Sequence, residues 1–121
     1  MPNVENSKRY DLEDRTYLFA KTVRSFAKLL PRTEANRVDV RQLLRASGSV
    51  AANYIEANES LSKKDFLYRI RVCRKEAKEC RLHLRLLDSG EQESIERQRN
   101  QLIQEAIELI SIFSAILKKS E

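Results

Sequence analysis

Apolar residues recur every three to four positions in four stretches of the chain, and short polar segments separate these stretches. This spacing is typical of amphipathic α-helices that pack one face into a core. We predict helices over residues 12–30, 37–59, 62–88 and 93–118. The third stretch has the most regular apolar seam. Its positions alternate in steps of four and three residues: Phe66, Ile70, Cys73, Ala77, Cys80, Leu84 and Leu87.

Polar residues and a proline mark the ends of the predicted helices. Asp11 can cap the first helix, because its carboxylate can accept hydrogen bonds from the first free backbone N–H groups. Pro31 ends that helix, since the residue before a proline is disfavoured in helical geometry. Asn36 or Thr33 caps the second helix, and Ser62 caps the third.

These elements predict an all-α fold, a left-handed, up-down-up-down antiparallel four-helix bundle. Short connections favour antiparallel neighbours, and a repeat of about 3.5 residues favours left-handed packing. The chain has only two glycines and two prolines, too few for a turn-rich β protein. We expect one domain over residues 11–121 and a flexible N-terminal tail over residues 1–10.

The chain has no apolar run close to the roughly 20 residues that a membrane-spanning helix needs. Its first ten residues also lack the apolar core of a signal peptide. We therefore expect a cytoplasmic protein that has no membrane partner. Cys73 and Cys80 fit a reducing compartment. Two helical turns hold them about 10 Å apart, beyond disulfide reach, so we expect them to be small core residues.

Small residues fill the centre of the second predicted helix, over residues 46–52 (ASGSVAA). Gly48 costs about 1 kcal/mol of helix propensity relative to alanine. Something must offset this cost, and we expect close packing of a neighbouring helix.

The net positive charge of the chain comes from residues 62–88. This stretch has nine lysines and arginines against four acids, whereas the rest of the chain has fourteen of each sign. Five of these basic residues form a stripe beside the apolar seam, which we call the basic ridge: Arg71, Arg74, Lys78, Arg81 and Arg85.

The basic ridge has two interpretations. Acids on a neighbouring helix, such as Glu105 and Glu108, or on another subunit would neutralise it. Alternatively, the phosphates of RNA or DNA would relieve its internal repulsion and release counterions. No aromatic platform for base stacking accompanies it, so we expect any contact to be to the backbone and weakly specific for sequence.

The fourth predicted helix has more apolar surface than one partner can cover. One seam can face the core of the bundle. We expect the second to contact another copy of the chain in a homo-oligomer. It consists of Ile103, Ile107, Ile110 and Leu117.

The sequence gives little support for catalysis or a metal site, and we expect no enzymatic activity, metal or cofactor. The one histidine, His83, lies off the apolar seam, and a lone helical histidine is usually a packed or surface residue. The sequence contains no Glu-x-x-His pair of the di-iron type and no glycine-rich phosphate loop.

Asn53 and Glu56 lie at the edge of the second helix, and Glu76, Glu79 and Lys75 lie midway along the third. They form either solvated surface ion pairs or a polar network at a helix or subunit junction.

Four segments of the chain have a recognisable combination of motifs: residues 41–57 (RQLLRASGSVAANYIEA), 63–66 (KKDF), 75–80 (KEAKEC) and 84–87 (LRLL). Through these segments the chain resembles the bacterial four-helix-bundle proteins encoded in intervening sequences of large-subunit ribosomal RNA genes. The similarity extends from about residue 11 to the C-terminus. A related group is the accessory variability protein of diversity-generating retroelements.

The resemblance implies a small bundle that assembles into a homopentamer without enzymatic activity. For the retroelement relatives it implies binding of nucleic acid and of a reverse transcriptase through a basic surface. Asn53, Glu56 and Glu76 match recurring polar positions of the family. We thus expect a non-catalytic oligomer that binds RNA or DNA through the basic ridge, or alternatively a structural scaffold with no nucleic-acid role.

Overall fold

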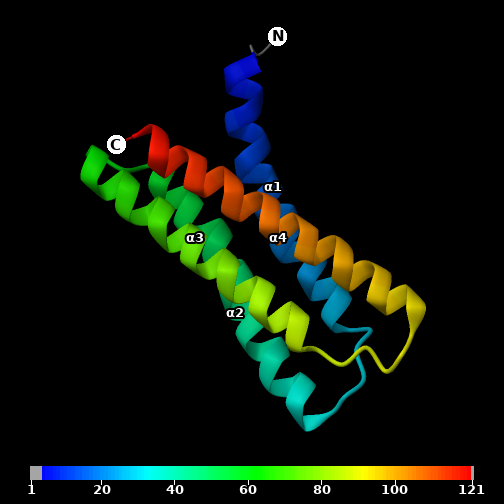
Figure 1. Ribbon diagram of the computed structural model, residues 1–121. Coiled ribbons are helices and arrows are strands. Elements are labelled where there is room, and N and C mark those ends of the chain that lie inside the picture. The colour runs from blue at the N-terminus through cyan, green and yellow to red at the C-terminus, as the bar shows by residue number, and fades with distance from the viewer. Residues whose placement is uncertain (1–3, 121) are drawn as a thin grey trace.

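The computed structural model describes the backbone of residues 4–120 and the side chains of residues 12–120 (Figure 1). It contains the helices α1 (Val4–Ala27), α2 (Glu34–Asn58), α3 (Lys63–Leu86) and α4 (Glu93–Lys119). Over these residues the chain has no strand. The predicted all-α four-helix bundle is confirmed.

Consecutive helices run in opposite directions and lie side by side, and α4 returns along α1 (Figure 1). Within the described residues, the backbones of the diagonal pairs α1–α3 and α2–α4 do not approach each other closely, although side chains of diagonal helices meet in the core, where the rings of Tyr54 on α2 and Phe113 on α4 have centroids 6.4 Å apart. The helices therefore surround the core in chain order. The seam between α1 and α4 is the most sparsely packed of the four.

α1 begins at Val4, earlier than the predicted start at residue 12, and ends at Ala27. Asp11 therefore lies inside the helix and is not its N-cap. The prediction of a flexible tail falls on residues 1–10, whose side chains lie outside the described part of the chain. The helix was predicted to continue to Leu30 and to end at Pro31, but it ends three residues earlier than that, and Leu30 lies in the following loop as a buried core residue.

Thr33, not Asn36, is the N-cap of α2, and its Oγ1 accepts a hydrogen bond from the Asn36 N–H at 3.1 Å. Asn36 has a different role. Its buried amide donates to the carbonyls of Pro31 and Asp88, both at 2.9 Å, and accepts from the Asp88 N–H at 2.9 Å. Asn36 therefore fastens the α1–α2 loop to the α3–α4 loop at one end of the bundle.

Gly90 lies at the same end and has a φ of 67°, in the left-handed region that glycine tolerates best. A Cβ at this position would lie 3.0 Å from Cγ of Pro31. Glycine is needed here for both the backbone conformation and the close approach of the two loops.

The core follows the predicted seam of α3: six of its seven members are buried, and Phe66 is partly buried against them. Cys73 and Cys80 are free and fully buried. Burial raises the pKa of both thiols to about 12. Other helices contribute large apolar side chains to the same core, including Phe19, Val23, Phe26, Leu43, Val50, Leu109 and Phe113.

The sequence predicted that Gly48 of α2 allows a neighbouring helix to pack closely, but the structure shows a different reason for the glycine. A Cβ there would lie 3.3 Å from Nη2 of Arg24 on α1. The same guanidinium donates to the Leu44 carbonyl at 3.3 Å and to Ser47 Oγ at 3.4 Å. Gly48 thus makes room for an arginine side chain rather than for a neighbouring backbone.

Candidate nucleic-acid interface

The basic ridge runs along α3 from Arg71 to Arg85, a length of roughly 21 Å at 1.5 Å per residue. Three of its side chains are exposed and two, Arg74 and Arg81, are partly buried. None of the five forms an ion pair or a side-chain hydrogen bond with another residue in the described part of the chain. The ridge therefore keeps its charge uncompensated within one chain.

Several arginines elsewhere in the bundle form contacts within the chain. Arg45 of α2 binds two acids of α3. Arg69 of α3 donates to Asn53 at 2.9 Å. Arg99 of α4 donates to the Leu87 carbonyl at the end of α3 and pairs with Glu96. Arg32, Arg41 and Arg97, which are exposed outside the ridge, have no such partner in the described part of the chain either. The ridge is distinguished by five unpaired cations that line up along one face of a single helix.

Glu105 and Glu108 do not neutralise the ridge, contrary to one of our interpretations. Both bind Arg15 of α1: Nε and Nη2 lie 2.7 and 2.9 Å from the Glu105 carboxylate, and Nη2 lies 2.8 Å from Glu108. Hydrogen bonds and charge attraction from Glu105 and Glu108 raise the pKa of Arg15 above its ordinary value. The two acids thus face α1, away from α3.

A shallow groove of about 440 Å³ follows the outer surface of α3. Three of its lining residues, Arg71, Arg74 and Lys78, belong to the basic ridge predicted from the sequence. The sequence did not place the other three on the same surface, because this depends on how the side chains pack on the helix. The groove is lined by Arg71, Arg74, Lys75, Lys78, Glu79 and Leu82. Four cations and one carboxylate therefore meet at one surface.

A polar network joins α2 to α3, as one of the interpretations predicted. Glu76, only 4% exposed, accepts hydrogen bonds from Arg45 at 2.8 and 3.3 Å. Arg45 also donates to Glu79 at 2.9 Å. Burial opposes the charge of Glu76, but hydrogen bonds from Arg45 and Ser49 outweigh it and lower its pKa.

The other two predicted members of the network differ from each other. Asn53 takes part: its amide donates to the Ser49 carbonyl at 2.9 Å and accepts from Arg69. Glu56 has an exposed side chain on the outside of α2, and no described residue bonds to its carboxylate. The network thus contains Asn53 and Glu76, with Arg45 and Arg69 as the partners that sequence alone did not identify.

His83 is a packed residue. Its Nδ1 lies 2.9 Å from Oδ1 of Asp39 on α2, and the two side chains are 16% and 15% exposed. Together with Glu76 and Glu79, His83 places the polar side of α3 against α2. Because successive helical residues are 100° apart, the ridge lies roughly 150° around the helix from this polar side.

The second apolar seam of α4 has a mixed environment. Leu117 is buried in the core of its own chain, while Ile103 and Ile110 are partly buried against that core. Ile107 is 37% exposed. Arg99, which reaches α3, is four residues before Ile103 on the same face, so this seam borders the α3 side of α4.

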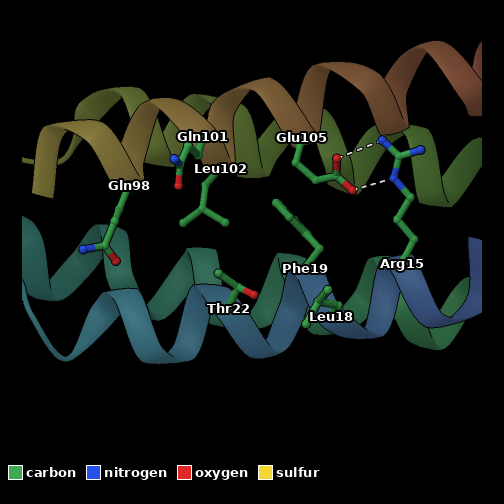
Figure 2. Close-up of a pocket in the computed structure, with 8 residues that line it drawn as sticks. All are labelled: Arg15, Leu18, Phe19, Thr22, Gln98, Gln101, Leu102 and Glu105. Carbon is green, nitrogen blue, oxygen red and sulfur yellow. Dashed lines mark hydrogen bonds and ion pairs between the residues drawn. The ribbon is translucent and has the colours of Figure 1, made fainter. Parts of the chain in front are cut away.

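A cleft of about 500 Å³ opens between α1 and α4 (Figure 2). Its floor is apolar, formed by the buried Phe19 and Leu102, and Leu18 is 60% exposed at its edge. Neutral side chains line it further along, and the Arg15–Glu105 pair closes one end (Figure 2). The cleft therefore has little net charge, unlike the groove on α3.

Among the described residues, no three His, Cys, Asp or Glu side chains gather in an arrangement suited to a metal ion. None of the described helices combines the length and apolarity that a bilayer span requires.

Comparison with known proteins supports the resemblance found in the sequence. The family model of the 23S rRNA-intervening sequence proteins matches residues 8–115. No curated protein matches the chain significantly. Among solved structures, the chain is similar to a protein of unknown function from the S23 ribosomal protein family of Bacteroides thetaiotaomicron. The two share 27% identity and a TM-score of 0.76, over 88% of this chain and 98% of the other.

Proposed function

Because the chain belongs to the 23S rRNA-intervening sequence protein family, a description that names no activity, we propose its function from its own surface. It is a non-catalytic oligomeric protein that binds the phosphates of RNA or DNA through the basic ridge. One observation carries this proposal. The five ridge cations have no partner among the described residues, while four other arginines, Arg15, Arg45, Arg69 and Arg99, are all engaged within the bundle.

Electrostatics explains why a polyanion suits the ridge. Like charges three and four residues apart repel one another along a helix, and the acids that could relieve them are bound to Arg15 and Arg45. Phosphates along a nucleic-acid strand would supply a row of negative charges of similar length to the ridge, and binding would release condensed counterions. These contacts carry no sequence information, so the proposed binding is weakly specific.

Fluorescence anisotropy with a labelled 20-nucleotide RNA that lacks self-complementarity tests the proposal. Five phosphate contacts on a single strand give a slope of about −3.5 in log affinity against log salt concentration. The affinity should therefore fall about 100-fold between 50 and 200 mM salt. A flat salt response would refute phosphate binding.

The variant Arg74→Glu, Arg81→Glu should lose this binding. The matched control is Lys21→Glu, Lys28→Glu, which changes the net charge equally. Both lysines are exposed: Lys21 lies on α1 and Lys28 directly after its end, and the backbone of α1 does not approach that of α3. If the two double variants lose affinity to the same extent, overall charge explains the binding and the ridge has no special role.

A second candidate function, an interaction scaffold, is supported by the apolar surface of α4 and by the α1–α4 cleft. Ile107 is the most direct test of self-association, because Ile103 and Ile110 also pack against the core. We expect Ile107→Glu to dissociate the oligomer in sedimentation velocity while its helical circular dichroism is retained. A wild-type chain that sediments as a monomer at micromolar concentration would exclude the oligomer.

A further inference from the structure

The groove on α3 contains one carboxylate, Glu79, among four cations that line the same surface. A carboxylate at a phosphate-binding surface repels the phosphates of the nucleic acid that this surface would bind. Its presence there is unexpected for a purely phosphate-binding groove, unless the ligand also offers a hydrogen-bond donor next to its phosphates.

Two neighbours fix the orientation of this carboxylate. Oε1 accepts a hydrogen bond from Arg45 Nη2 at 2.9 Å. Oε2 lies 3.8 Å from Lys75 Nζ, within ion-pair range but beyond hydrogen-bond length. Because Lys75 lines the groove, Oε2 is the oxygen on the groove side. The Glu79 side chain is 33% exposed, so a ligand in the groove can reach it.

We propose that Glu79 makes the basic groove selective for RNA over DNA by accepting a hydrogen bond from a ribose 2′-hydroxyl. This inference rests on the proposed phosphate binding by the ridge. The 2′-hydroxyl is the donor that distinguishes RNA from DNA at a backbone contact. It lies beside the phosphates of its own strand, and Glu79 lies beside the groove cations: it lines the same groove as Arg71, Arg74 and Lys78 and is one helical turn from Lys75.

The two sugars meet different surroundings in this groove. With RNA, the hydroxyl satisfies Oε2 and offsets the repulsion between the carboxylate and the phosphates. With DNA, the ligand offers Oε2 no hydrogen-bond donor, Lys75 remains its neighbour at 3.8 Å, and the repulsion from the phosphates is not offset. A hydrogen bond to a charged group is among the stronger ones, so we expect RNA to bind about tenfold more tightly than DNA of the same sequence.

Three labelled single strands of one sequence test the inference by anisotropy at 50 mM salt: RNA, DNA and 2′-O-methyl RNA. The methylated strand keeps the RNA-like sugar shape but has no 2′ donor. We expect it to bind like DNA. If it binds like RNA, the preference comes from backbone shape and the proposed role of Glu79 is wrong.

The variants Glu79→Gln and Glu79→Ala should bind DNA two- to threefold more tightly than wild type, because one negative charge has gone. Glu79→Ala should reduce the preference for RNA to less than about twofold. Glu34→Gln is the matched control: it removes an exposed carboxylate at the start of α2 and should leave the preference intact. Thermal melting of each variant verifies that the bundle is folded, since Arg45 retains its contacts with Glu76.

The outcomes separate this inference from the proposed function. Salt-sensitive binding with equal affinity for RNA and DNA overturns the role of Glu79 and leaves phosphate binding intact. A preference for RNA that persists in Glu79→Ala also overturns it. Absence of binding to all three strands overturns the proposed function itself, and the inference with it.

Discussion

The buried amide of Asn36 should be one of the most sensitive polar sites in the bundle. It is 2% exposed and makes three hydrogen bonds of 2.9 Å to the backbone of Pro31 and Asp88. Each such bond contributes about 1 kcal/mol net. We therefore expect Asn36→Ala to lower the free energy of unfolding by about 3 kcal/mol.

A loss of this size is large relative to the stability of a domain, which is typically about 5–15 kcal/mol. For a chain of 121 residues, the entropy of unfolding near the melting temperature is about 0.25 kcal/mol per kelvin, so the melting temperature should fall by about 12 °C. Asn36→Asp should be at least as harmful at pH 7, because a carboxylate cannot donate to the two carbonyls.

Urea unfolding followed by circular dichroism at fixed protein concentration measures the effect, because self-association would make stability concentration-dependent. Asn58→Ala is the matched control. Asn58 is exposed on the same helix and makes one side-chain contact, 3.4 Å from Glu13, so its loss should cost less than about 0.5 kcal/mol. Equal stabilities of the two alanine variants would show that Asn36 does not hold the loops together.

Further predictions concern the buried carboxylate of Glu76, the two core thiols and the two glycines. The pKa of Glu76 is lowered in the folded state. Its contribution to the free energy of unfolding should therefore be complete above the unfolded pKa of about 4.3 and lost as pH falls through the folded pKa. The stability difference between wild type and Glu76→Gln should shrink in urea titrations below pH 4.3, and a constant difference would contradict this. Burial gives the thiols of Cys73 and Cys80 pKa values of about 12. Both should therefore react with Ellman's reagent at pH 8 only as the protein unfolds. Rapid reaction in native buffer would contradict their burial. Gly48→Ala should raise the free energy of unfolding by up to about 1 kcal/mol, the difference in helix propensity, because the nearby guanidinium can move. Gly90→Ala should lower the free energy of unfolding by about 1 kcal/mol or more, because its backbone is left-handed. Thermal melting of the two variants should therefore shift in opposite directions.

The apolar periodicity of the sequence was enough to predict the fold. It placed the buried seam of α3 correctly because that seam depends only on spacing along one helix. Helix ends were less predictable. Thr33 and Asn36 both carry an acceptor suited to capping, and the choice depended on Asp88, which is 52 residues from Asn36 in the sequence. Similarly, Asp11 has the chemistry of an N-cap although α1 begins earlier.

The polar partners were harder to predict because they join different helices. Glu76 and Asn53 were recognised as candidates for a network, but Arg45 and Arg69 look like any other surface arginine in the sequence. Their roles follow from which face of α2 meets α3. The room at Gly48 likewise depends on Arg24 of α1, so a pattern of small residues within α2 could not identify what fills it.

The position of each acid explains why the basic ridge remains without partners. The acids midway along α3, Glu76 and Glu79, lie on the side that meets α2, where Arg45 binds them. Glu105 and Glu108 of α4 lie on the side that meets α1, where Arg15 binds them. Glu76, Glu105 and Glu108 therefore face away from the ridge, whereas Glu79, although bound by Arg45, also lines the groove with Arg71, Arg74 and Lys78. Neutralising the ridge with these acids would require breaking the existing pairs, which favours the proposal of a negatively charged partner outside the chain. A polyanion and an acidic surface of another subunit both meet this requirement, and only the polyanion predicts an affinity that follows the salt dependence of counterion release.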